Sequence, residues 1–168
     1  MSLASTLAHG ARFALAFLML AVAGASVARA ELHIDITRGK VEPMPIAIPQ
    51  FAGGDGTVAQ DVTQVLSADL ERSGLFKPID PKAFIDKDAA TDIPPRYGDW
   101  RVINAQALVT GNIDAQADGR LQVEFRLWDV FAEQQLTGLR YTTPPQNWRR
   151  VAHIVADAIY KRFTGEDG

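Results

Sequence analysis

The sequence contains no cysteine, which excludes disulfide bonds and leaves no thiol to carry a lipid anchor. It has only three histidines. The two that follow residue 30, His33 and His153, have no second ligand at a useful spacing, so no structural metal site is expected. Positive charge is also scarce, with 17 basic residues against 20 acidic ones and a net charge of −3. That balance excludes a surface built to bind nucleic acid.

The patterns that carry enzymatic chemistry are missing as well. The sequence has no G-x-x-x-x-G-K-[ST] phosphate loop. Ser67 and Ser73 lack the G-x-S-x-G context of a nucleophile elbow. Asp86 and Asp88 lie in a polar, proline-containing stretch, where a solvated turn is a better interpretation than an acid–base pair. We therefore expect neither a catalytic residue nor a cofactor nor a metal ion.

The only long apolar run is FALAFLMLAVA, from Phe13 to Ala23. It follows a short polar start and precedes ARA at residues 28–30, an order typical of a secretory signal peptide. The run is shorter than the roughly 20 residues of a membrane span, so an uncleaved anchor is the weaker alternative. We expect residues 1–30 to be a signal peptide and 31–168 to be one soluble domain. Without the leader, 15 of the basic residues face 20 acidic ones, a charge of −5.

Hydrophobic periodicity predicts the elements of this domain. Apolar residues alternate in the strand ELHIDIT, whereas Val58, Val62, Leu66 and Leu70 follow the helical spacing. Asp55 or Thr57 is expected to cap that helix. Pro45, just before IAIPQF, and Pro49, inside it, make this stretch an unfavourable candidate for a fully paired central strand. The predicted strands are 31–37, 46–51, 75–80, 107–113, 121–128 and 135–142, and the predicted helices are 57–73, 98–105 and 148–164.

The element order predicts the fold class. A strand–helix–strand unit opens the sheet and a meander closes it around a turn at Asp118-Gly119. This order indicates an α/β domain of α+β-like character, with a mixed sheet and helices packed mainly on one face.

A glycine-rich loop is the first candidate site. Gly54, Gly56 and Ala59 spell G-x-G-x-x-A between a strand and a helix, the outline of a dinucleotide fingerprint. Asp55 would repel phosphate from the middle of that loop, and the repeated strand–helix units of a nucleotide crevice are missing. A tight turn is the favoured interpretation. A small-ligand or nucleotide-binding module that uses the loop Gly53–Thr57 is the alternative.

The predicted strand at the start of the mature chain is the second candidate. A terminal strand is held by few contacts, so it can detach and pair with the sheet edge of another protein. An ordinary edge strand is the alternative interpretation. The residues concerned are Glu31, Leu32, His33, Ile34, Asp35, Ile36 and Thr37.

Several stretches resemble the amino-terminal domain of the TolB family, periplasmic proteins of the Tol–Pal system in Gram-negative bacteria. They are ELHIDITRG, PIAIPQF, VLSADLERSGLFKPID, ALVTGNI, LQVEFRLWDV and RRVAHIVADAIYKRFTGEDG, and the similarity extends over essentially all of Glu31 to Gly168. The resemblance implies a fold similar to anticodon-binding domains. It implies a non-enzymatic role that links the lipoprotein Pal to TolA and supports envelope integrity and cell division.

The resemblance also implies a partner site. In the family, the extreme mature N-terminus contacts TolA, which corresponds here to Glu31–Thr37. Family members continue into a β-propeller that carries the Pal-binding surface, whereas this sequence stops at TGEDG. A fragment of a longer protein and a variant without a propeller both explain that difference. In either case no residue of this chain is assigned to Pal.

Overall fold

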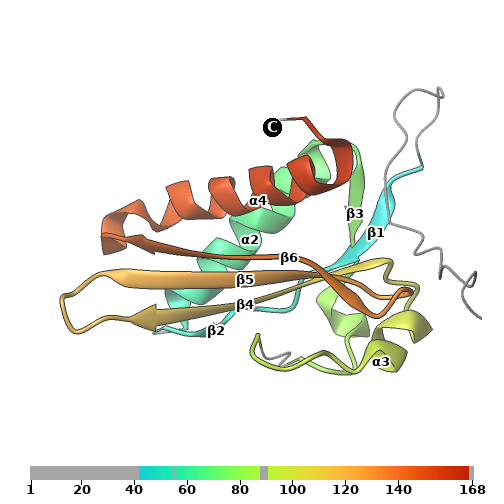
Figure 1. The fold of residues 1–168 in the computed structure, drawn as a ribbon, viewed down its shortest axis with the longest axis horizontal. Coiled ribbons are helices and arrows are strands. Elements are labelled where there is room, and N and C mark those ends of the chain that lie inside the picture. Colours follow the sequence, from blue (N-terminus) through green and yellow to red (C-terminus); the bar gives the residue numbers. More distant parts are fainter. Residues whose placement is uncertain (1–41, 55, 88–90, 167–168) are drawn as a thin grey trace, which may run out of the picture. The chain divides into compact units, whose positions relative to one another are not determined.

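The computed structural model describes residues 42–54, 56–87 and 91–166, all within the unit that spans residues 31–168. The predicted strand Glu31–Thr37 lies outside these ranges. Figure 1 shows a sheet with two long helices, α2 and α4, and a short helix, α3. In chain order the elements are β1 (Met44–Ala47), β2 (Ala52–Gly53), α2 (Thr57–Arg72), β3 (Phe76–Pro78), η1 (Pro81–Ala83), α3 (Tyr97–Val102), β4 (Ala107–Ala115), β5 (Leu121–Asp129), β6 (Gln134–Thr143), η2 (Pro145–Asn147) and α4 (Trp148–Thr164).

The sheet is mixed, as predicted. Its strand order is β3-β1-β4-β5-β6, and β2 pairs with β4 beyond the end of β1. β1 is parallel to both β3 and β4, whereas β4, β5 and β6 form an antiparallel meander. The turn at Asp118-Gly119 joins β4 to β5, which confirms the predicted hairpin. The fold class is therefore confirmed: an α/β domain that begins with a strand–helix–strand unit.

The position of β1 corrects part of one prediction. Its prolines were expected to keep this segment from being a fully paired central strand. β1 is central, between β3 and β4, but only Ile46 has partner residues in both neighbours. The carbonyl of Pro45 accepts from the backbone N–H of Gln106 at 2.9 Å, so the Pro45 nitrogen also faces the β4 side. At that level β4 has not begun, and the missing N–H removes no ladder bond. Pro49 follows the end of the strand.

The two long helices cover one face of the sheet. Their buried residues, such as Leu66 of α2 and Ile159 and Phe163 of α4, join Val109, Phe125 and other sheet residues in the larger core cluster. Packing of these apolar stripes supplies most of the stability of such helices. Gly74 and Gly165 follow α2 and α4 with φ of 75° and 78°, as expected for helix ends.

A second, smaller core lies on the opposite face, under α3 and η1. Trp100 of α3 and Phe84 pack there against Leu108 and Trp128 of the sheet. Trp128 is 6% exposed, and its Nε1 donates to the Thr110 hydroxyl at 3.1 Å. Trp128 therefore packs beneath α3, with its ring centroid 6.3 Å from that of Tyr97. Because α2 and α4 are much longer than α3, the expectation of helices mainly on one face is confirmed.

The N-terminus of α2 differs from the prediction. The N-cap of α2 is Gly56, and no side chain caps this helix within the described residues. Thr57 is the first helical residue, so its prediction as a cap was wrong, and Asp55 lies outside the described residues. Asn147 occupies the N-cap position of α4, but its side chain makes no capping hydrogen bond.

No helix in the described ranges has the length and apolar character required to cross a membrane.

Candidate functional site

The candidate partner segment, Glu31–Thr37, lies outside the described residues, but the sheet limits where a further strand could join it. β1, β4 and β5 each have described strands on both sides. Among the described strands, the edges belong to β3, β6 and the outer side of β2. All positions between these edges are taken by residues 44–143.

The glycine loop has a structural explanation. Gly53 has φ of 77° and lies so close to β4 that a Cβ there would be 2.3 Å from the Ile113 carbonyl oxygen. Gly54 and Gly56 also have positive φ, at 66° and 82°, which side chains rarely adopt. Two grooves, described below, lie beside the loop, and neither Gly54 nor Gly56 lines them. The glycines are therefore accounted for by the close approach to β4 and by the sharp entry into α2.

Phe51 fixes the segment between β1 and β2. Its backbone N–H donates to the Thr63 hydroxyl of α2 at 3.0 Å, and that hydroxyl donates to the Ala59 carbonyl at 2.8 Å. The Phe51 ring, in a residue that is 2% exposed, lies over Gly111 of β4. A Cβ at residue 111 would be 2.2 Å from that ring. The loop is thus held between helix and sheet, which leaves its outer side to form the walls of two grooves.

The first of these, here called the α2 groove, has a volume of about 570 Å³ and lies between α2 and the segments that follow β1 and β3. It lies at the carboxyl ends of the parallel strands β1 and β3, and no residue of β4 is in its lining. Its polar lining includes Gln50, Gln60, Gln64, Ser67, Glu71 and Asp80.

A neighbouring groove of about 620 Å³ shares Gln50 and Pro81 with the α2 groove. Its lining contains Gly53 and two lysines, Lys82 and Lys87. The two grooves therefore differ in charge, because the charged lining residues of the α2 groove are both carboxylates. Asp80 also accepts from the backbone N–H of Lys82 at 2.9 Å, which anchors η1 between the grooves.

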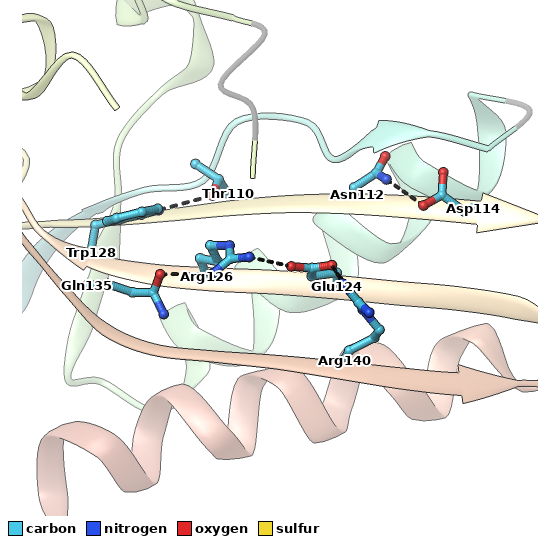
Figure 2. A network of polar contacts seen from close by, with 8 residues as sticks. All are labelled: Thr110, Asn112, Asp114, Glu124, Arg126, Trp128, Gln135 and Arg140. Atoms are coloured by element: carbon cyan, nitrogen blue, oxygen red, sulfur yellow. Dashed lines mark hydrogen bonds and ion pairs between the residues drawn. The ribbon is translucent and has the colours of Figure 1, made fainter. Parts of the chain in front are cut away.

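The open part of the sheet face opposite α2 and α4 carries a row of paired polar side chains, shown in Figure 2. Glu124 accepts from Arg126 of the same strand at 2.8 Å and from Arg140 of β6 at 2.6 Å. Asn112 donates to Asp114 at 2.7 Å along β4. These pairs are partly exposed, and each contributes at most about 1 kcal/mol.

The titratable residues considered for chemistry occur as structural pairs. Asp69 of α2 contacts Arg72 at 2.9 Å and His153 of α4. Asp86 pairs with Arg96 at 3.4 Å, while Asp88 lies outside the described residues.

Burial and, secondarily, the Asp129 carboxylate raise the pKa of Tyr97. Among the described residues, no three His, Asp or Glu side chains are close enough to hold a metal ion.

The α2 groove could not be identified from the sequence, because its walls come from three separate segments. One local signal does exist. Gln60, Gln64, Ser67 and Glu71 recur at helical spacing beside the apolar stripe of α2. Three of these four side chains are polar and uncharged, which is unusual for a solvated helix face rich in Lys and Glu.

Comparison with known proteins gives consistent results. Residues 32–136 match the family model described as the TolB amino-terminal domain. The Tol-Pal system protein TolB of Paramagnetospirillum magneticum is 59% identical over 155 residues, which cover 90% of this chain and 35% of that protein. The crystal structure of TolB from Acinetobacter baumannii superimposes with a TM-score of 0.61 at 30% identity, covering 82% of this chain and 32% of that one. The chain spans about a third of the length of both relatives.

Proposed function

Because the chain belongs to the TolB amino-terminal domain family, we propose that it is a non-enzymatic interaction domain of the Tol–Pal system. It acts in the periplasm, after export and removal of residues 1–30, and supports outer-membrane integrity and cell division. Its direct partner is TolA. The single observation that carries this proposal is the family match, which begins at Leu32 and so covers the candidate partner segment except for Glu31.

The contact is made by strand addition. Residues Glu31–Thr37 pair with an edge of the TolA sheet, and backbone hydrogen bonds supply affinity. Leu32, Ile34 and Ile36 pack on one face, and the alternate side chains set the register. The occupancy of every interior sheet position by residues 44–143 supports this, because the domain does not need the segment as a central strand. Ordering or detaching the segment opposes binding, so the affinity should be modest.

A titration against the TolA C-terminal domain tests the proposal. We compare a chain that starts at Glu31 with one that lacks Glu31–Thr37, and expect binding only for the first. Equal affinities would refute the proposal. Circular dichroism of both chains checks that the sheet of residues 44–143 remains folded.

Two matched substitutions test the strand geometry. Ile34→Asp should weaken binding at least about tenfold, because burial of an isoleucine side chain is worth about 1.5–3 kcal/mol. Asp35→Asn, on the opposite face of the same strand, should change affinity only slightly. A similar loss for both variants would contradict the predicted alternation.

The nucleotide alternative predicts a different result. A ligand held by Gly53–Thr57 would raise the melting temperature in a thermal-shift screen with nucleotides, and Gly54→Val would abolish the rise. The close contact of Gly53 with Ile113 explains the loop without a ligand, so we expect no rise.

A further inference from the structure

We propose that the α2 groove binds an extended peptide segment of a partner protein, with a lysine or arginine side chain of that segment at the carboxylates Glu71 and Asp80. The proposal does not use Glu31–Thr37. The described wall of the groove is made by the loop after β1, by α2, and by the end of β3 with the loop that follows it.

The shape of the groove favours an extended chain. Its wall on α2 runs from Gln60 to Glu71, which at 1.5 Å per residue is a length of about 16 Å. An extended peptide covers that distance with about five residues. Small ligands instead occupy enclosed, mostly apolar pockets that bury most of their surface. The α2 groove is open along one side and flanked by polar helix residues.

The polar lining suits a peptide backbone. A glutamine side chain offers both an N–H donor and a carbonyl acceptor, the same pair of groups that each peptide unit presents. The side-chain amides of Gln50, Gln60 and Gln64 make no hydrogen bond to any described residue. The Thr63 hydroxyl, by contrast, is already bonded to Phe51 and Ala59. Three amides of the groove lining are therefore available to a peptide.

The charge of the lining selects a basic segment. Glu71 makes no ion pair within the described ranges, and no lysine or arginine lines the α2 groove. A phosphate-bearing ligand would meet two carboxylates and no cation there, so a nucleotide does not suit this groove. Lys82 and Lys87 of the neighbouring groove would repel a basic side chain. The basic side chain of the peptide therefore lies toward Glu71 rather than toward η1.

The test uses the full chain labelled with nitrogen-15 and two pools of capped pentapeptides. All positions are randomised except the central one, which is lysine in one pool and glutamate in the other. Side-chain NH₂ signals of glutamine are directly visible in proton–nitrogen spectra. We expect the lysine pool to shift the signals of Gln50, Gln60 and Gln64, and the glutamate pool to leave them in place.

Three variants locate the site. Ala68→Arg puts a long cationic side chain into the groove and should abolish the shifts. Glu71→Gln removes one carboxylate without changing the size of the side chain, and should weaken the response about two- to fivefold. Asp157→Asn is the matched control, because it makes the same kind of change on α4, outside the groove. It should have no effect.

The outcomes are distinct. Unchanged glutamine signals at millimolar peptide would overturn the proposal, as would equal shifts with both pools, or shifts produced by ATP. Loss of the response in Asp157→Asn would show a general charge effect and would also overturn it. Should Ala68→Arg fail to fold, Glu71→Gln alone decides. Deletion of Glu31–Thr37 should leave the peptide response intact, which separates this site from the TolA contact.

Discussion

The contact between Phe51 and Gly111 should control the stability of the domain, and a double-mutant cycle can measure it. The nearest atom of the Phe51 ring would lie 2.2 Å from a Cβ at residue 111, whereas ordinary contact begins at 3.4 Å. In Gly111→Ala the ring must therefore retreat by about 1 Å inside a packed core. Overpacking of this kind destabilises by about 1–3 kcal/mol, and a gain of about 0.5–1 kcal/mol from removing a strand glycine opposes it.

The second arm of the cycle removes the ring. Phe51 is 2% exposed, so Phe51→Ala should destabilise by about 3–5 kcal/mol through lost burial and the cavity left behind. In the double variant the new methyl group at residue 111 enters that cavity, and the clash of the single variant disappears. We expect the double variant to be more stable than the sum of the two single effects predicts, by about 1–3 kcal/mol.

Urea unfolding followed by circular dichroism measures all four free energies of unfolding. Gly98→Ala is the control, because no atom lies within 4 Å of a Cβ there and the residue is inside α3. This substitution should be stabilising by about 0.5–1 kcal/mol. Additive effects of Phe51→Ala and Gly111→Ala would refute the explanation of why residue 111 is a glycine.

Two further predictions concern single interactions. Thr110→Val keeps the shape of the side chain but leaves the buried Trp128 Nε1 without its acceptor, so we expect a loss of about 1–3 kcal/mol in urea unfolding and an unchanged fold; a neutral result would contradict a role for this bond. Arg150→Glu places a negative charge in the first turn of α4, which has no acidic residue, and should raise stability by about 0.3–1 kcal/mol at low salt, an effect that 1 M NaCl should remove.

The sheet illustrates where sequence reasoning was sufficient. The hairpin of β4 and β5 follows from alternation on both sides of Asp118-Gly119, and both patterns depend only on neighbours in the chain. The place of β1 was mispredicted, because a proline argues against pairing only when its nitrogen faces an existing partner strand. Whether β4 has begun at that level depends on residues about sixty positions away.

The two candidate sites also differ in whether the sequence alone can identify them. The segment Glu31–Thr37 was identified through alternation and family resemblance, both of which are properties of a continuous stretch. The α2 groove could not be identified in this way. Gln50, Gln64 and Asp80 belong to different segments, and only the return of the chain through α2 and β3 places them around one cavity.

The sequence by itself therefore determined most of the described local elements and the family, since turn residues, hydrophobic periods and family motifs are encoded over short stretches. The tertiary structure alone decided the partner of Asp69, the glycine at residue 111 and the charge of each groove. Each of these is a contact between residues distant in the chain. Close packing of the two helices on the sheet, rather than any local preference, sets which of them meet.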